Sequence, residues 1–456
     1  MAKKRLIVLG GGFAGLDVVR SVARSKAARE VWDTLLIDKE NFFQFNPLLP
    51  AIAVGSVETR HIVYPLREMA RHRHIRFQKN KVTAIDLARH EVRLHNDLVE
   101  PYDTLVISVG STTNYYGVPG APENTRPFKT IVDAMYLRAR FVELFEMAEQ
   151  AETREQRRRL LSFAMVGGGV TGVEVAAELS EMARETLLPR YPSLTADDVA
   201  ITIYEGGDRV VPTARPDHSA YIHRYLTKHG VRIELGARVE RVEPKCLHLV
   251  GGATAPAFTI IWTAGVHPPE LVRSLPLTHI QDGRVRVDPY LRALDRAGKP
   301  VEDLYVLGDC AASPTHDGRW QPALSQTGIA MGSYVGECLT RRAEGKPLRE
   351  FSFKDAGYII SLGKHSSVLD LFGIPLSGKL AWLLWAGAYL VKMVGFRKQV
   401  EVAFDQLTHL VFEHDTSQIL NRRQVLTDEE LNLSLGDTQS ESKRDAGHRD
   451  GERVRL

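Results

Sequence analysis

The chain has 456 residues, of which 44% are hydrophobic and 25% are charged. This length and balance predict a folded protein of two to four domains. The net charge of +3 is too small to indicate a nucleic-acid partner. Its three cysteines form no CxxC pair, and its sixteen histidines show no ligand spacing. We therefore predict no disulfide framework and no metal site, and the free thiols favour a reducing compartment.

The N-terminal segment predicts a nucleotide-binding βαβ unit over residues 5–38. Residues 1–5 run straight into the apolar strand 6–9, so no signal peptide is expected. The turn Gly10-Gly11-Gly12-Phe13-Ala14-Gly15 then begins a helix. In such a turn the first glycine makes the bend, the second lets backbone approach a pyrophosphate, and the third allows close packing of helix on strand. A second strand over 34–37 ends at Asp38, whose carboxylate can accept hydrogen bonds from ribose hydroxyls.

Mixed strands are predicted from 75 to 110 and a charged helical connector from 128 to 160, before the same pattern repeats. The strand 163–166 leads into Gly167-Gly168-Gly169-Val170-Thr171-Gly172, and the strand 201–204 ends at Glu205. Because a carboxylate repels a 2′-phosphate, Glu205 favours NAD over NADP. A solvated acid at the strand end is the alternative. The interval to Glu205 is long, so residues 185–199 must form an excursion after the helix.

Two further motifs predict that the chain returns to the first nucleotide site. They are the strand and turn 105–111, which contains Gly110, and the strand 304–307 followed by Gly308-Asp309 at the start of a helix. The Asp309 carboxylate can bond the ribityl hydroxyls of a flavin, with simple helix capping as the alternative. The expected fold class is α/β, with two Rossmann-like dinucleotide-binding domains, the second inserted into the first, and amphipathic helices at the C-terminus.

The C-terminal region predicts association with a membrane surface. Residues 380–391 are apolar and lie between Lys379 and Lys392, but they fall short of the roughly 20 residues that a membrane crossing needs. A second amphipathic segment follows from 400 to 411, with Arg397 and Lys398 between the two. One apolar stripe is expected to contain Leu380, Leu383, Leu384, Val391 and Val394, with Trp382, Trp385 and Tyr389 as interfacial aromatics. A helix pair packed on the domain or in a dimer interface is the alternative.

These motifs carry a resemblance to a known family. The two glycine turns, the segment 260–266 and Gly308-Asp309 resemble the flavoproteins with two dinucleotide-binding domains. Within them, Phe45-Asn46-Pro47-Leu48-Leu49-Pro50, Thr171-Gly172-Val173-Glu174 and the segment 376–385 are similar to type II NADH:quinone oxidoreductases. The similarity covers about residues 5–425.

The resemblance implies FAD at the first turn and NADH at the second. The residues implied in cofactor binding are Gly10, Gly12, Phe13, Ala14, Gly15, Asp38, Lys39, Pro47, Val82, Gly110, Gly308 and Asp309 for FAD, and Gly167, Gly169, Thr171, Gly172, Glu205, Ala264 and Gly265 for NADH. Glu174 would face the nicotinamide and flavin, unless it is merely an exposed acid in the first turn of its helix. Gln326 matches the first glutamine of the family's quinone motif, or is a plain surface glutamine. Ala330 replaces the second glutamine, which leaves the acceptor open.

The implied function is a peripheral flavoenzyme on the cytoplasmic face of a membrane, passing two electrons from NADH through FAD to a quinone without pumping protons. Because residues 39–60 contain no cysteine, a dithiol relay near the flavin is disfavoured. The alternatives are a soluble NADH:acceptor flavin reductase and a flavin-bearing redox sensor. A homodimer is compatible with the sequence. The expected domains are 1–115 and 285–370 for FAD, 116–284 for NADH with the connector, 371–432 for the membrane helices, and a disordered tail over 433–456.

Overall fold

The structure is a computed structural model, which describes residues 2–71, 75–315, 318–393, 395–412, 414–417, 420–427 and 430. The expected disordered tail lies outside these residues. A first sheet of six strands has the order β21 (Arg292–Leu294), β22 (Pro300–Val306), β9 (Thr104–Ile107), β1 (Lys4–Leu9), β2 (Trp32–Asp38) and β5 (Arg76–Lys79). All neighbours are parallel except β21 and β22. The continuous apolar runs of β1 and β9 fit strands covered on both faces.

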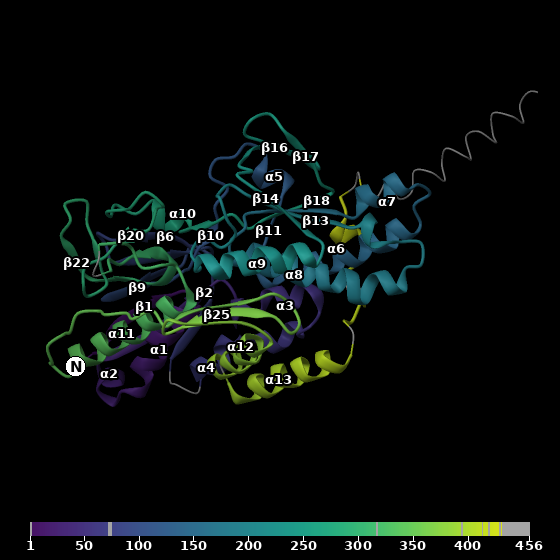
Figure 1. The fold of residues 1–456 in the computed structure, drawn as a ribbon. Coiled ribbons are helices and arrows are strands. Elements are labelled where there is room, and N and C mark those ends of the chain that lie inside the picture. The colour runs from purple at the N-terminus through teal and green to yellow at the C-terminus, as the bar shows by residue number, and fades with distance from the viewer. Residues whose placement is uncertain are drawn as a thin grey trace, which may run out of the picture.

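The helix that follows β1 packs closely against a helix from much later in the chain. These are α1 (Phe13–Arg24) and α11 (Ser325–Ala343), with α2 (Lys26–Val31) beside them in Figure 1. The close approach requires glycine, because a Cβ added at Gly332 of α11 would lie 2.2 Å from the carbonyl oxygen of Ala14. The start of α1, which carries the first turn, is therefore fixed by tertiary packing.

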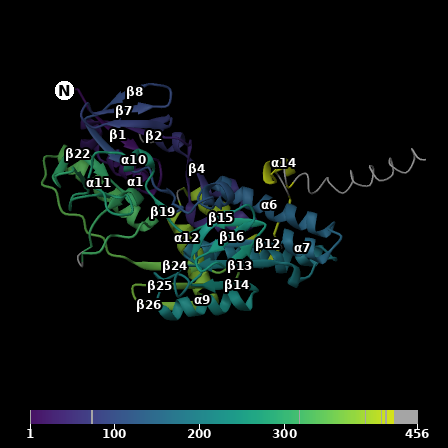
Figure 2. The same cartoon turned by 90° about the horizontal axis from the view of Figure 1, so that it is seen from above.

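A second sheet of five parallel strands is formed by β11 (Arg126–Pro127), β18 (Thr259–Trp262), β12 (Ser162–Val166), β13 (Ala200–Glu205) and β14 (Val231–Leu235), in that order. Its helices are α6 (Ile131–Glu149), α7 (Arg154–Leu160), α8 (Val170–Glu181) and α9 (Pro216–Lys228). The chain leaves the first sheet after β9 and returns at β21, which confirms that the second unit is inserted into the first. The two sheets occupy different halves of the molecule in both views (Figure 1, Figure 2).

Short elements surround the two sheets. The predicted excursion before β13 consists of a π-helical segment Met182–Leu187 and single turns at Leu188–Arg190 and Ala196–Asp198. The small strands are β3 (Phe42–Gln44), β4 (Val63–Pro65), β6 (Val82–Asp86), β7 (Glu91–Leu94), β8 (Val99–Pro101), β10 (Thr112–Thr113), β15 (Val239–Glu243), β16 (Cys246–Leu249), β17 (Thr254–Pro256), β19 (Val266–His267), β20 (Val285–Arg286) and β23 (Ala311–Ala312). The short helices are α3 (Leu49–Val54), α4 (Leu66–Arg71), α5 (Ala121–Asn124), α10 (Glu270–Arg273) and 3-10 turns at Asn46–Leu48, Thr59–Ile62 and Gly308–Cys310.

The C-terminal part is an antiparallel sheet followed by helices. The sheet contains β24 (Gly357–Ser361), β25 (Ser367–Leu371) and β26 (Ile374–Gly378), and the helices are α12 (Lys379–Lys392), α13 (Phe396–Val411) and α14 (Arg422–Val425). Helices α12 and α13 lie at one edge of the molecule, below α3 in Figure 1. Among the described residues, no helix has both the length and the apolar character needed to cross a membrane.

The C-terminal helices confirm part of the predicted apolar stripe and correct another part. Leu380, Leu383 and Leu384 are 58%, 60% and 43% exposed. Trp382 and Trp385, however, are only 9% and 7% exposed, so the prediction of interfacial tryptophans is wrong. Their large apolar rings are buried against the body of the protein, Trp382 with its ring beside that of His365. The side chains of Tyr389 and Val391, and residue Val394, lie outside the described structure.

Helix α13 likewise has one buried face and one exposed apolar face. Val402 is fully buried and Asp405 forms a buried contact with His61, whose Nδ1 lies 2.5 Å from Oδ2 of Asp405. On the opposite face the exposed apolar side chains are Phe396, Val400, Phe404 and Leu407. The exposed apolar residues of α12 and α13 are hereafter called the apolar rim: Leu380, Leu383, Leu384, Phe396, Val400, Phe404 and Leu407.

Candidate functional site

The first glycine turn leaves an open space where a pyrophosphate is expected. Gly10 has φ of +93°, and an added Cβ would lie 2.3 Å from the carbonyl oxygen of Ser108. A Cβ at Gly15 would lie 2.0 Å from the carbonyl oxygen of Gly10, whereas a Cβ at Gly12 would meet no protein atom within 4 Å. The fold itself therefore requires glycine at positions 10 and 15. It does not require glycine at position 12, and the open space at Gly12, beside the N-terminus of α1, suits a bound anion.

Asp38 lies beside this turn, as its position at the end of β2 predicts. Its Oδ2 accepts a hydrogen bond from the Gly11 N–H at 2.6 Å, and its Oδ1 accepts one from the Glu40 N–H at 2.7 Å. Burial raises the pKa of Asp38, while the two backbone N–H groups act in the opposite direction. Lys39 is exposed, and Pro47 and Val82 are half-buried. The carboxylate is therefore fixed at the edge of the turn by backbone donors.

The return of the chain brings Asp309 to the end of β9. Ser111 donates a hydrogen bond to Oδ2 of Asp309 at 2.5 Å, and Nζ of Lys129 lies 3.7 Å from the same oxygen. Lys129 also donates to Ser111 at 2.8 Å. Gly110, with φ of +71°, lies between β9 and Ser111. Sequence reasoning missed Lys129, because it belongs to no motif and only the tertiary fold brings it here.

The prediction that Gly308-Asp309 starts a helix is wrong. Gly308 and Asp309 form a single 3-10 turn with Cys310. The chain then continues as β23, which pairs with β20, and the long helix α11 begins only at Ser325. The pairing of β23 extends the backbone immediately after Cys310 and prevents a helix there. Asp309 consequently caps no long helix, which removes the simple alternative for this carboxylate.

The second glycine turn repeats the geometry of the first. Gly167 has φ of +109°, and an added Cβ would lie 2.6 Å from Cα of Ala264. A Cβ at Gly172 would lie 2.0 Å from the carbonyl oxygen of Gly167, whereas one at Gly169 would meet nothing within 4 Å. Thr171 lies in the first turn of α8. The open space again lies at the middle glycine of the fingerprint.

Glu205 occupies the position that Asp38 has at the first turn. Its Oε2 accepts the Gly168 N–H and its Oε1 accepts the Gly207 N–H, both at 2.7 Å. Gly265, which follows β18, has φ of +144°, and an added Cβ would lie 2.2 Å from the hydroxyl oxygen of Tyr116. Tyr116 is 64% exposed and was not predicted as a site residue. No sequence signal marks it, since its contact with Gly265 depends on the pairing of β10 with β19.

Glu174 is buried on α8, so the alternative of an exposed first-turn acid is wrong. The residue is 7% exposed, and its Oε1 accepts the Ser361 N–H at 3.1 Å from the end of β24. Burial raises the pKa of Glu174 to about 8, with the Ser361 N–H acting in the opposite direction. One turn later, Glu178 is also buried, and burial together with the charges of Glu181 and Glu174 raises its pKa well above the ordinary value.

Gln326 contacts the other end of β24. Its Nε2 donates to Oδ1 of Asp355 at 2.7 Å and to the carbonyl oxygen of Gly357 at 3.0 Å. Gly357 and Ser361 are the two ends of one short strand, so the backbone groups held by Gln326 and Glu174 are roughly 13 Å apart. The structure therefore joins the two predicted catalytic residues through β24 without bringing them into contact.

Comparison with known proteins identifies the family. A family model described as pyridine nucleotide-disulphide oxidoreductase matches residues 4–332. The chain is 29% identical over 451 residues to the mitochondrial internal alternative NAD(P)H-ubiquinone oxidoreductase A1 of Arabidopsis thaliana, covering 91% of this chain and 86% of that protein. It is also 29% identical over 413 residues to the type II NADH:quinone oxidoreductase Ndh of Mycobacterium tuberculosis, covering 87% of this chain and 86% of that protein.

A solved structure shows the same fold. The structure of NDH2 from Plasmodium falciparum in complex with NADH has a TM-score of 0.82 at 19% identity, covering 91% of this chain and 100% of that one. The fold agrees with the two-sheet architecture described above, and the family model spans most of the chain. The chain belongs to the pyridine nucleotide-disulphide oxidoreductase family.

Proposed function

We propose that the protein is a peripheral membrane flavoenzyme that transfers two electrons from NADH, through FAD, to a membrane quinone without pumping protons. The observation that carries the proposal is the pair of equivalent glycine turns, each with open space at its middle glycine and a fixed acid at the next strand end. The names of the similar proteins from Arabidopsis and Mycobacterium support a quinone as acceptor. The segment 39–60 contains no cysteine, which argues against a dithiol relay near the flavin.

The residues of the first site fit FAD. The space at Gly12 suits a pyrophosphate, Asp38 suits the ribose hydroxyls, and Asp309 suits the ribityl chain. Lys129 would orient the Asp309 carboxylate through Ser111. Bound FAD would supply a ring that accepts a hydride and returns electrons to a quinone. The protein's part is to hold the two nucleotides in fixed positions and to exclude water.

The second site fits NADH, with Glu205 selecting against a 2′-phosphate. Gly169 provides the close approach to the pyrophosphate, and Ala264 and Gly265 border the same turn. We assign residues 1–115 and 285–370 to the FAD-binding domain and 116–284 to the NADH-binding domain. The insertion of the second sheet between β9 and β21 supports these boundaries.

Glu174 is proposed to hold a proton beside the nicotinamide and the flavin, which passes its electrons to the quinone. With a pKa of about 8, the carboxyl is mostly neutral at neutral pH. Reduction of a quinone to a quinol takes up two protons with the two electrons, and a buried neutral acid can supply one of them. Gln326, fixed by Asp355 and Gly357, is proposed to contact a quinone carbonyl. Ala330 leaves the second carbonyl without an amide partner from that position.

The apolar rim is proposed to contact the membrane from which the quinone comes. Its side chains lie on one face of α12 and α13. Beside them Arg397 and Lys398 both pair with Glu401, so these three residues carry a net charge of +1, which suits anionic lipids. We therefore assign 371–432 to membrane association and place the protein on the cytoplasmic face, where NADH is available. A second copy of the chain covering the same rim is the competing arrangement.

The decisive experiment measures NADH oxidation by the purified full-length protein with long-chain quinones in liposomes and with soluble acceptors. We expect flavin released on denaturation to be FAD, and quinone-dependent turnover to exceed turnover with soluble carriers. Flotation with the liposomes is measured on the same sample. Fast turnover only with soluble acceptors, without flotation, would instead establish the soluble reductase. Slow turnover with every acceptor would favour the redox sensor.

A further inference from the structure

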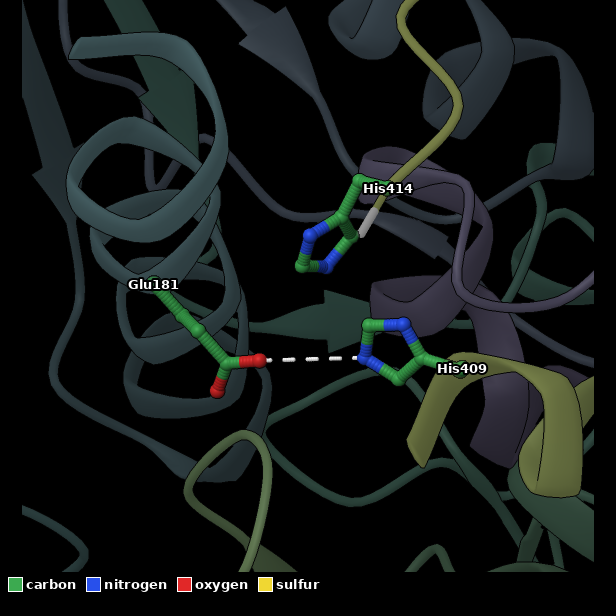
Figure 3. Close-up of side chains that lie close together, drawn as sticks. All are labelled: Glu181, His409 and His414. Atoms are coloured by element: carbon green, nitrogen blue, oxygen red, sulfur yellow. Dashed lines mark ion pairs between the residues drawn. The ribbon is translucent and has the colours of Figure 1, made fainter. Parts of the chain in front are cut away.

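Three side chains outside the nucleotide sites converge where α8 meets the C-terminal segment. Glu181 is the last residue of α8, His409 lies in the last turn of α13, and His414 lies in the segment that follows. One nitrogen or oxygen atom from each lies within 4.8 Å of the others, and Oε1 of Glu181 is 3.7 Å from Nε2 of His409. Figure 3 shows the three side chains pointing toward one another. They come from distant parts of the sequence, so no local ligand spacing reveals them.

Two atoms of this cluster are buried without a hydrogen-bond partner among the described residues. They are Oε1 of Glu181 and Nε2 of His414. Buried polar atoms are nearly always satisfied by protein, water or an ion, so two such atoms in one cluster indicate a place for a water or an ion between them.

The other polar atoms of Glu181 and His414 form hydrogen bonds with residues outside the cluster. Nδ1 of His414 lies 2.8 Å from the Thr186 hydroxyl, which leaves Nε2 directed at the cluster. The second carboxylate oxygen of Glu181 accepts the Lys364 N–H. Gly363, with φ of +85°, permits this contact, since an added Cβ would lie 2.3 Å from that oxygen. Outer partners that orient a ligating histidine and carboxylate in this way are typical of metal sites.

We propose that Glu181, His409 and His414 bind one divalent transition-metal ion, with Zn²⁺ the best fit, and that the ion ties the C-terminal segment to α8. Two imidazole nitrogens and one carboxylate oxygen are a ligand set that zinc accepts, with water in the fourth position. Mg²⁺ and Ca²⁺ prefer sets made of oxygen. Ligand atoms around tetrahedral zinc lie roughly 3.4 Å apart, so the 3.7 Å contact needs almost no movement. All ligand atoms lie within 4.8 Å of one another, so no pair needs to approach by more than about 1.4 Å on binding.

The consequence is structural and does not depend on the redox reaction. The last turn of α13 and the segment after it would be fixed to the end of α8 by coordination bonds, in addition to the contact of His61 with Asp405. Helix α13, which carries four of the seven residues of the apolar rim, would thereby be held on the body of the protein. Zinc should raise resistance to unfolding, since a ligand bound only by the folded state stabilises that state.

The test uses full-length, FAD-loaded protein treated with a chelator and then titrated with Zn²⁺. We expect one Zn²⁺ per chain by calorimetry, no binding of Mg²⁺, and a rise in Tm of roughly 2–4 °C at a hundredfold excess over Kd. His409→Gln and His414→Gln should each weaken binding at least about tenfold. His95→Gln is the matched control, because His95 is an exposed histidine far from the cluster, and its binding should equal the wild type.

X-ray absorption at the zinc edge of the wild type gives a measurement that needs no variant. Two imidazole ligands are expected. The proposed zinc site would be overturned by any of three results. These are a zinc shell made only of oxygen, equal Zn²⁺ affinity of the His95, His409 and His414 variants, and no binding of Zn²⁺ to the wild type. Flavin content and circular dichroism of His409→Gln and His414→Gln identify any loss of folding, in which case the absorption spectrum alone decides.

Discussion

The buried carboxyl of Glu174 makes stability depend on pH, and Glu174→Gln should remove that dependence. Burial raises the pKa of Glu174 to about 8 from 4.5, with the Ser361 N–H opposing the rise. Between these two pH values the folded protein keeps a proton that the unfolded chain releases. The neutral carboxyl therefore favours the folded state fully below pH 4.5, and this contribution is lost as the pH rises through about 8.

The magnitude follows from the pKa displacement. A change from 4.5 to about 8 sets an upper limit of about 5 kcal/mol on the stability lost over this range. Relaxation around a buried charge reduces the penalty and still leaves a few kcal/mol. Glutamine retains an oxygen that can accept the Ser361 N–H, and it cannot ionise. The variant should therefore lack this pH dependence while it keeps the packing of α8 on β24.

The assay is thermal unfolding of the FAD-loaded wild type and variant from about pH 5.5 to about pH 8.5, the range in which the carboxyl titrates. We expect the Tm of Glu174→Gln relative to the wild type to increase steadily with pH. Glu185→Gln, at an exposed position in the segment that follows α8, is the control and should follow the wild type throughout. Parallel curves for Glu174→Gln and the wild type would refute the reasoning, as would a difference that grows toward low pH.

Three further predictions address the nucleotide sites and the apolar rim. The wild type should prefer NADH to NADPH by roughly 5- to 150-fold in kcat/KM, measured by steady-state kinetics, and Glu205→Gln should reduce this ratio. Equal kcat/KM values for NADH and NADPH in the wild type would contradict the prediction. Gly169→Ala should weaken NADH binding at unchanged Tm, because a Cβ at Gly169 meets no protein atom within 4 Å. Gly172→Ala should lower Tm, because its Cβ would lie 2.0 Å from the carbonyl oxygen of Gly167. Equal losses of Tm in the two variants would argue against open space at Gly169. Phe404→Asp should abolish liposome flotation but preserve flavin bleaching by NADH in stopped flow, since Phe404 is 65% exposed; retained flotation would exclude Phe404 from the membrane contact. Truncation of the chain after Ser377 removes α12 and α13 and should likewise abolish flotation. Because it also removes the buried side chain of Trp382, the truncation should lower Tm as well.

The sequence by itself determined the two nucleotide turns and the insertion of one unit in the other. Gly10 and Gly167 need positive φ, and Gly15 and Gly172 have no room for a side chain, so local geometry marks these positions in the chain. The acids at the ends of β2 and β13 were also predictable, because parallel strands place their carboxyl ends at one edge of the sheet. These features depend on residues close together in sequence or on a regular strand pattern.

Only the tertiary structure decided the surroundings of these motifs. Lys129 reaches Asp309, and β24 reaches Glu174, through contacts between segments that no local pattern connects. The sequence marks Trp382 as apolar, but packing on the C-terminal sheet decides that it is buried while its neighbour Leu383 is exposed. The meeting of Glu181 with His409 has the same origin. Burial, pKa and ligand geometry depend on which distant segments come into contact, and that is settled by the packing of the whole chain.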